Sequence, residues 1–420
     1  MLTMKSILRW ALVLVGLMVV YSLALAGVGY TSLKLYVGQK NWPRALMNGP
    51  KALEEDPEKP DVYRQYGIAL AESDSLARAG QVLAKGLEIA KAQNDADQLK
   101  ELTTTRDYYY IKRFNAAAVQ LQNGLEVEDS LGKQPDTSKV EVRAVLAQTT
   151  QKFRQCLEMA DEAILLKADD EKCWSLRGNA LGKLGRHAEA VQAYRKALEV
   201  KPDYQLAKDN LFASLTNSVV TYMRAQDWES AVVTAEQLVA MGDTNSLVTI
   251  GDCYTNKAIG TPKGAQRDSM FLKAVTYYQK YLANNPKDTT VIGYCISSMT
   301  QGHDSTSAIA MAKGLVAAEP YEPFGYMRLA EAASGNSSLA NGALSTFAVL
   351  VKGQQVLKPE LKPAPKSQAA GILARLGPPD RVYTHSIDKY KILCLFYPKK
   401  GEIHGFVQDQ EFFKILFTPI

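Results

Sequence analysis

The amino-acid sequence predicts a mostly α-helical protein, an α-solenoid of repeated helix hairpins that follows one apolar N-terminal helix and precedes a small α+β domain. Three observations predict this class. In residues 31–351, apolar residues recur at helical spacing in units of about 34 residues. An uncharged run extends from Trp10 to Tyr30, and strand-like alternation replaces the helical period after residue 366. At 420 residues the chain exceeds a typical single domain, which agrees with an array.

The clearest unit is residues 171–204, where the residue types explain how two helices pack. Small residues such as Gly178 and Ala190 let two antiparallel helices approach closely, and bulky residues surround that contact. Gly185 lies where a turn between helices needs a positive φ. Pro202 lies where the second helix must end, because proline cannot continue a helix. The residues that define the unit are Trp174, Gly178, Leu181, Gly185, Ala190, Tyr194, Ala197 and Pro202.

Numbered from Glu171, these residues occupy positions 4, 8, 11, 15, 20, 24, 27 and 32. The pattern resembles the tetratricopeptide repeat (TPR). The resemblance implies a TPR-type solenoid in which hairpins stack on one another, because a single hairpin cannot bury its own apolar face.

More degenerate units extend the array on both sides. Residues 31–128 contain three, at Ser32–Glu58, from near Pro60, and from about Asp97 to Glu128. Residues 129–138 are polar, contain glycine and proline, and predict a loop. The repeats of residues 139–351 begin with a helix pair at Lys139–Asp170. The clear unit follows, and further units lie at about 205–243, 244–287, 288–320 and 321–351.

Residues 1–30 predict a membrane or export segment. Lys5 and Arg9 precede an uncharged run of about 20 residues, the length that crosses a bilayer. Ala24-Leu-Ala26 also fits a signal-peptidase site, so a signal anchor and a signal peptide both stay open. We expect an uncleaved anchor with the bulk of the chain on the extracytoplasmic, periplasmic side. Cleavage after Ala26 would instead give a soluble secreted or periplasmic protein.

The sequence after residue 351 contains two further segments, a linker and a small domain. Residues 352–366 are rich in proline and predict an extended linker. Residues 367–420 predict a small α+β domain with a helix at Ser367–Leu376, a Leu-Gly-Pro-Pro-Asp turn, and strands at Arg381–His385, Tyr390–Tyr397, Glu402–Val407 and Phe412–Phe417. This order resembles the small envelope lipoprotein family SmpA/OmlA. The simpler alternative is a β cap that shields the open end of the solenoid.

Composition and motifs predict no enzyme, no cofactor, no metal site and no nucleic-acid partner. The net charge of +5 comes from residues 351–420, and no phosphate-binding stripe accompanies it. The five cysteines include no CxxC, and we expect most of them in the core. The four histidines form no metal-ligand pattern. Cys394 could act as a nucleophile only if His385 or His404 approached it.

By the TPR resemblance, the first helix of each unit lines a concave groove that takes peptides or helices. The residues at groove-facing positions are Arg64, Lys172, Ser175, Asn179, Lys183, Asn245, Asp252 and Asn256. Lys172, Asn179 and Lys183 could bind a carboxylate or backbone carbonyl groups, although each could also be an ordinary solvated side chain. The Lys/Asn/Arg set with which some TPR domains grip a C-terminal carboxylate is interrupted, since Val220 occupies one of its positions.

These observations predict a non-enzymatic scaffold that binds other proteins or peptides and acts in biogenesis or assembly of the bacterial cell envelope. In the alternative hypothesis, the C-terminal α+β domain carries a ligand-binding or enzymatic activity and the repeats recruit its target. A third hypothesis is an anchored adaptor that faces the cytoplasm.

Overall fold

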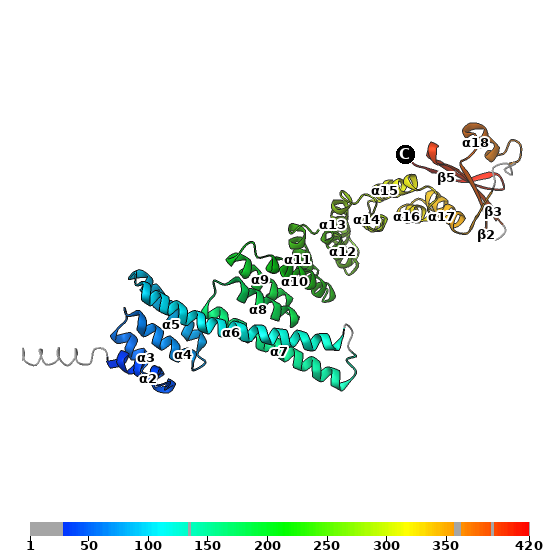
Figure 1. Cartoon of the computed structure of the whole chain (residues 1–420). Helices are drawn as coiled ribbons and strands as arrows, with labels where there is room; N and C mark the ends of the chain where they lie inside the picture. The colour runs from blue at the N-terminus through cyan, green and yellow to red at the C-terminus, as the bar shows by residue number, and fades with distance from the viewer. Residues whose placement is uncertain (1–27, 133–135, 357–362, 388–389, 420) are drawn as a thin grey trace, which may run out of the picture. The chain divides into compact units, whose positions relative to one another are not determined.

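The computed structural model describes residues 28–132, 136–356, 363–387 and 390–419 (Figure 1). The chain divides into two compact units between Asn217 and Ser218, within helix α10 (Gln205–Arg224). The predicted membrane or export segment lies outside the described residues, apart from Val28–Tyr30, which begin helix α2. Among the residues that are described, no helix combines the length and the apolar character needed to cross a bilayer.

Unit 1 is built from helix hairpins. The helices are α2 (Val28–Gly38), α3 (Trp42–Glu55), α4 (Pro60–Ala71), α5 (Leu76–Ala92), α6 (Ala96–Leu131), α7 (Val140–Leu166), α8 (Glu171–Lys183), α9 (His187–Val200) and the first part of α10. Helices α2 and α3, α4 and α5, α6 and α7, and α8 and α9 pack in pairs. Polar side chains at Asn41, Asp95 and Asp170 cap the helices that follow them.

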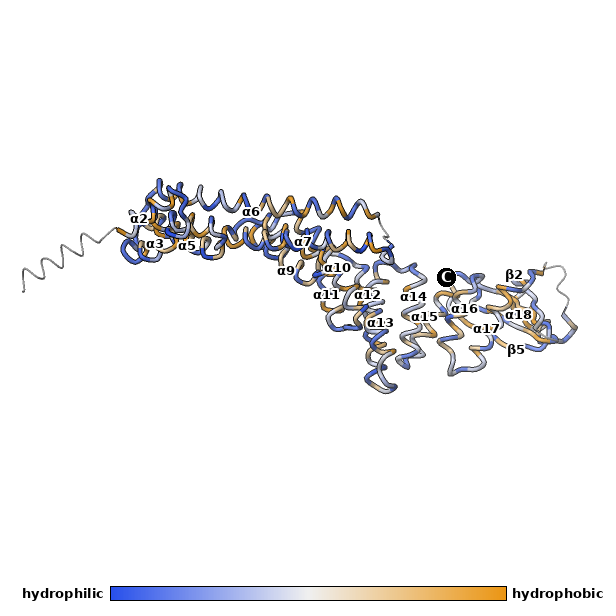
Figure 2. The backbone as a smooth tube through the Cα atoms, turned by 90° about the horizontal axis from the view of Figure 1, so that it is seen from below, coloured by the Kyte–Doolittle hydropathy of each residue, from blue (hydrophilic) through white to orange (hydrophobic). Residues whose placement is uncertain are grey.

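Two of the predicted hairpins are wrong, because each of the two segments forms a single long helix, α6 or α7. Residues 97–128 and 139–170 each have the length of a repeat, yet each forms one continuous helix, and the two pair with each other. Helix α7 contains no glycine or proline, and the only glycine of α6 is Gly124, so neither has residues that would end a helix at its middle. Apolar and polar residues alternate along both helices (Figure 2). The predicted loop 129–138 is shortened, because α6 continues to Leu131.

The described part of unit 2 continues the hairpin pattern after the end of α10. Its helices are α11 (Trp228–Ala240), α12 (Ser246–Ile259), α13 (Ala265–Leu282), α14 (Thr289–Gln301), α15 (Ser305–Ala318), α16 (Pro323–Ala332) and α17 (Ser337–Lys352). Each packs against the next, and the buried residues of α13 to α17 join one hydrophobic core that continues into the C-terminal sheet.

The close contacts that the repeat pattern predicts are present in both units. A Cβ atom at Gly178 would lie 2.6 Å from the Tyr194 ring, and one at Gly251 would lie 2.3 Å from the Tyr278 ring. Gly185 has a φ of +73°, as the turn after α8 requires. Leu181, Ala190 and Ala197 are fully buried. Trp174 Nε1 donates a hydrogen bond to the Ala168 carbonyl oxygen at 2.9 Å, and Pro202 follows the end of α9.

The C-terminal segment forms an antiparallel sheet with the strand order β1-β2-β3-β4-β5. The strands are β1 (Gln354–Gln355), β2 (Arg381–Ile387), β3 (Tyr390–Tyr397), β4 (Glu402–Val407) and β5 (Gln410–Leu416), and helix α18 (Gln368–Leu376) precedes β2. The 3₁₀ turn η2 (Pro398–Lys400) and Gly401, with φ of +66°, connect β3 to β4. The predicted helix and four strands are therefore confirmed. Strand β1 lies inside the predicted linker, since pairing with β2 gives these two glutamines a partner.

One face of the sheet packs against the last repeat, and the other face packs against α18. Along β3, Ile392, Cys394 and Phe396 join the core of α17 and the neighbouring helices, whereas Leu395 and Tyr397 pack with α18. A Cβ atom at Gly342 of α17 would lie 2.9 Å from Phe413, so helix and sheet are in close contact. The segment is thus part of unit 2 rather than a separate domain, and it closes the C-terminal end of the helical array.

Candidate functional site: a polar cleft in unit 1

Two of the predicted groove residues, Asn179 and Lys183, line a cleft of about 550 Å³ in unit 1. Four helices form it: α6 on one side, and α8, α9 and α10 around the rest. The lining residues are Leu121, Leu125 and Glu128 of α6, Asn179, Gly182 and Lys183 of α8, His187 and Tyr194 of α9, and Asn210, Ala213, Ser214 and Asn217 of α10.

Asn179 is oriented by two hydrogen bonds from within the cleft. Its Oδ1 accepts one from Tyr194 Oη at 2.7 Å and one from Asn210 Nδ2 at 3.0 Å. Both acceptor positions of this oxygen are therefore used, which leaves the amide group of Asn179 as a donor and the Oδ1 of Asn210 as an acceptor. One donor beside one acceptor matches the C=O and N–H groups of a peptide main chain. Burial raises the pKa of Tyr194, so its hydroxyl stays protonated and donates.

The charged groups of the cleft neutralise each other. Lys183 Nζ of α8 lies 2.5 Å from Glu128 Oε2 of α6. His187 adds no charge near neutral pH, because burial lowers its pKa. Its Nδ1 is buried and has no hydrogen-bond partner among the residues that the structure describes. The cleft is therefore polar but carries no net charge, which suits a neutral peptide segment better than a free carboxylate.

The other two predicted groove residues of α8 lie outside the cleft. Lys172 is exposed in the first turn of the helix. Ser175 is only 2% exposed, and its buried hydroxyl has no partner in the described part of the chain. The prediction that Ser175 faces a binding surface is therefore wrong, because this face of α8 packs inside the unit.

The predicted residues of unit 2 make contacts within their own hairpin or lie at its surface. Asp252 Oδ1 accepts a hydrogen bond from Tyr278 Oη at 2.7 Å, which repeats the Asn179–Tyr194 contact of unit 1. Burial raises the pKa of Asp252. Asn256 Nδ2 donates to the Asp252 carbonyl oxygen at 2.8 Å, and Asn245 is exposed just before α12.

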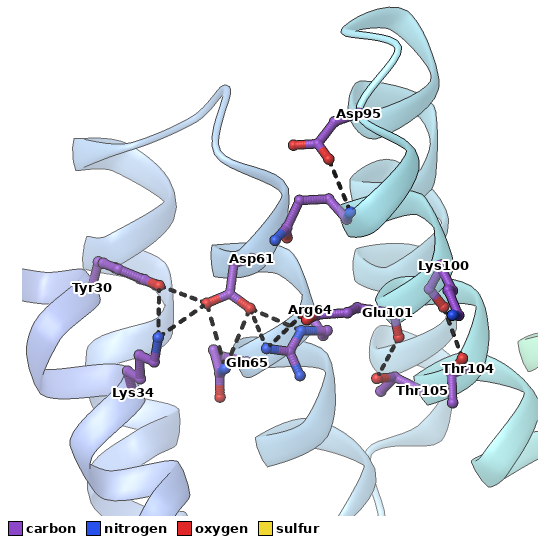
Figure 3. A network of polar contacts seen from close by, with 11 residues as sticks. Tyr30, Lys34, Asp61, Arg64, Gln65, Asp95, Lys100, Glu101, Thr104 and Thr105 are labelled. Carbon is purple, nitrogen blue, oxygen red and sulfur yellow. Dashed lines mark hydrogen bonds and ion pairs between the residues drawn. The ribbon is translucent and has the colours of Figure 1, made fainter.

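Arg64 belongs to a polar network that connects α2, α4 and α6 (Figure 3). Its guanidinium lies 2.5 Å from Asp61 Oδ1 and 3.1 Å from Glu101 Oε2. Tyr30 Oη donates to Asp61 Oδ2 at 2.5 Å, and Gln65 also contacts this carboxylate. Although burial opposes ionisation, hydrogen bonds from Tyr30 and Arg64 lower the pKa of Asp61. Two carboxylates therefore contact Arg64, and the ion pair with Glu101 connects α4 to α6.

The geometry of the sheet contradicts the hypothesis that Cys394 is a nucleophile. Cys394 is fully buried against the repeats, and burial strongly raises the pKa of its thiol, so the reactive thiolate is disfavoured. His404 lies on the opposite face, where its ring nitrogens contact Glu402 and Glu411. His385 pairs with Ile392, and no hydrogen bond joins it to Cys394 in the described structure. All five cysteines are buried, which confirms the prediction that most are core residues.

Sequence reasoning missed the contributions of α6 and α10 to the cleft. Asn210, Ser214 and Asn217 are spaced by four and three residues on α10, which is the spacing of one helix face. Helix α10 has 20 residues, whereas helix α8 of the clear unit has 13, so the 34-residue pattern does not assign these positions to a binding surface. The pattern also assigns no role to Leu121 and Leu125, because α6 is longer than a repeat helix. The signal that could have revealed them is the continuous helical period through both segments.

Comparison with known proteins agrees with this architecture. Residues 171–204 match the model of the tetratricopeptide repeat family, so the prediction of a TPR protein is confirmed for the unit that carries the pattern. The chain is thus a helical-repeat protein that contains a tetratricopeptide repeat at residues 171–204.

Curated relatives and solved structures add further similarity. The peroxisomal targeting signal receptor of Kluyveromyces lactis is 28% identical over 177 residues, which cover 41% of this chain and 30% of that protein. The receptor of the same name from Saccharomyces cerevisiae is 25% identical over 231 residues, covering 52% of this chain and 36% of the relative. The chain thus spans about a third of the length of these two relatives. The crystal structure of YrrB, a TPR protein with an unusual peptide-binding site, covers 46% of this chain with 93% of its own, at 15% identity and a TM-score of 0.30.

Proposed function

We propose that this protein is a scaffold that binds an extended segment of a partner protein in the cleft between α6 and helices α8–α10. The observation that carries the proposal is the Asn179–Asn210 pair, which presents one donor and one acceptor side by side in a cleft of about 550 Å³. This arrangement complements a main-chain peptide group. Because Glu128 neutralises Lys183, the bound segment needs no charged group of its own. The relatives are named as receptors of a targeting signal, which supports a peptide as the class of occupant.

Site-specific photocrosslinking in cells tests this function. A benzoylphenylalanine at position 183 points the crosslinker into the cleft, and one at position 192, an exposed residue of α9 that does not line it, is the control. We expect a discrete partner band from position 183 alone. The variants Asn179→Ala and Asn210→Ala should each weaken that band, because they remove one half of the donor–acceptor pair. Equal bands from both positions would contradict the proposal.

We also propose that the apolar run at Trp10–Tyr30 anchors the chain in a bacterial membrane, with the repeats on the periplasmic side and a role in envelope assembly. The support is the uncharged run itself, with Lys5 and Arg9 before it. Protease treatment of intact spheroplasts should digest the repeats if they face outward. Digestion only after lysis would favour the cytoplasm-facing adaptor. Release of the whole chain by osmotic shock would favour a leader cleaved after Ala26.

A further inference from the structure

Helix α8 contains two glycines four residues apart, Gly178 and Gly182, and packing requires only the first of them. At Gly178 a Cβ atom would collide with the Tyr194 ring at 2.6 Å, so the packing of α8 on α9 requires this glycine. At Gly182 a Cβ atom would meet nothing within 4 Å, and the backbone φ is not positive. Neither packing nor backbone geometry requires glycine there, and glycine in a helix costs stability relative to alanine.

The space that Gly182 leaves open belongs to the cleft. Gly182 lines it together with Leu121 and Leu125, which are one turn apart on α6 and only partly buried. The adjacent ion pair between Lys183 and Glu128 connects α8 to α6, so the two helices face each other here. The missing side chain and the two leucines together leave an apolar space beside the polar Asn179–Asn210 pair.

Building on the proposed function, we propose that this space is a specificity pocket for one apolar side chain of the bound segment. The Asn179–Asn210 pair binds the main chain of the segment regardless of its sequence, whereas Gly182, Leu121 and Leu125 select an uncharged, leucine-sized side chain next to it. A charged side chain in this position would lose its hydration and gain no counter-ion, because Lys183 and Glu128 already neutralise each other.

Selection of phage-displayed random peptides on the purified full-length chain tests the pocket. We expect the recovered peptides to share one position enriched in Leu, Ile, Met or Phe and depleted of Asp, Glu, Lys and Arg. The variant Gly182→Leu fills the pocket without meeting a neighbouring atom at its Cβ, so it should fold and should bind the recovered peptides about tenfold or more weakly. Gly314→Leu is the matched control, because Gly314 lies in helix α15 and also has nothing within 4 Å of its Cβ position.

The outcomes separate the pocket from the proposed function. Peptides that require Asn179 and Asn210 but show no apolar position, or that bind Gly182→Leu as tightly as the parent chain, would overturn the pocket and leave the proposed function intact. Failure to recover any peptide, or peptides that bind Asn179→Ala and Asn210→Ala as well as the parent chain, would overturn both. If Gly182→Leu and Gly314→Leu weakened peptide binding equally, the cause would be a change in the helices rather than a filled pocket. That result would also overturn the pocket.

Discussion

At the scale of single residues, one position of the repeat has the same structural role in both units. Asn179 and Asp252 occupy the same repeat position, and each accepts a hydrogen bond from the buried tyrosine of its own hairpin, Tyr194 or Tyr278. The tyrosine needs an acceptor, because a buried hydroxyl without a partner is costly. The acceptor in turn is held in one orientation at the surface of its helix. In unit 1 the rest of this surface forms a cleft of about 550 Å³.

The titration of Asp252 gives a pH-dependent prediction. Burial raises the pKa of Asp252, so the folded chain binds a proton there more tightly than the unfolded chain. Stability is therefore lost as the pH rises from the ordinary aspartate value of 3.8 through the raised value. Asp252→Asn keeps an acceptor for Tyr278 and removes the ionisation. We expect urea unfolding to show a more stable variant at neutral pH and a weaker pH dependence above pH 3.8. The exposed Asp203→Asn should change neither, and equal behaviour of both variants would contradict the prediction.

The two glycines of α8 give a second prediction. Gly178→Ala places a methyl group against the buried Tyr194 ring, and we expect it to destabilise unit 1 by about 1–3 kcal/mol. Gly182→Ala meets no atom and improves helix propensity, so it should be neutral or stabilise by up to about 1 kcal/mol. Chemical denaturation followed by circular dichroism measures both. A similar loss of stability in the two variants would show that Gly182 also serves packing.

At the scale of elements, the long α6–α7 hairpin departs most from the repeat pattern. Helix α6 has 36 residues and α7 has 27, whereas α8 and α9 have 13 and 14. In their outer parts, the Phe153 ring of α7 packs closely against Gly124 of α6. The hairpin also supplies one wall of the cleft, so its stability and the shape of the cleft are linked.

Phe153→Ala tests this element. Phe153 is 3% exposed, and removing its ring should cost about 3–5 kcal/mol in the free energy of unfolding of the hairpin. Hydrogen exchange should accelerate in residues 117–131 and 145–160 and stay unchanged in unit 2. Leu165→Ala, at a half-exposed position of the same helix, is the control and should have little effect. Unchanged exchange in α6 after Phe153→Ala would show that this contact does not hold the hairpin together.

At the scale of the whole molecule, the C-terminal sheet completes the core of unit 2. Phe396 of β3 is fully buried and contacts the rings of Tyr321, just before α16, and Tyr383 of β2. On the other face, Glu402 binds Arg375 of α18 and Lys414 of β5, and these partners lower its pKa to about 2. One face thus continues the repeat core while the other carries α18, which is the packing expected of a cap on the array. Its resemblance to the SmpA/OmlA family stays a prediction.

Calorimetry of the whole chain tests the cap. Phe396→Ala should remove about 3–5 kcal/mol from the stability of unit 2 and lower its transition temperature, with little effect on unit 1. Phe412→Ala removes a ring of the same size from the same sheet, but at a position that is 52% exposed, so it should change stability by no more than about 0.5 kcal/mol. If Phe396→Ala left the repeats of unit 2 unaffected, the sheet would be an independent domain rather than a cap.

The sequence by itself determined the features that depend on local pattern. The hairpin at 171–204, the glycine turn at Gly185, and the helix and strands after residue 366 all follow from residue type and period, and the structure contains each of them. Such features need only contacts between residues that are near in sequence, so the signal lies within one short window.

Only the tertiary structure decided which of these pieces share a core and a surface. The pairing of α6 with α7, the burial of Ser175, the engagement of Arg64 with Asp61, and the cap formed on α17 depend on residues far apart in the chain. The cleft is the clearest case, because Leu121, Gly182 and Asn210 come from three different helices and meet only when α6 continues as one helix through the predicted repeat. Helical period states which face of a helix is apolar, but the neighbour that covers this face is selected by packing across the whole unit.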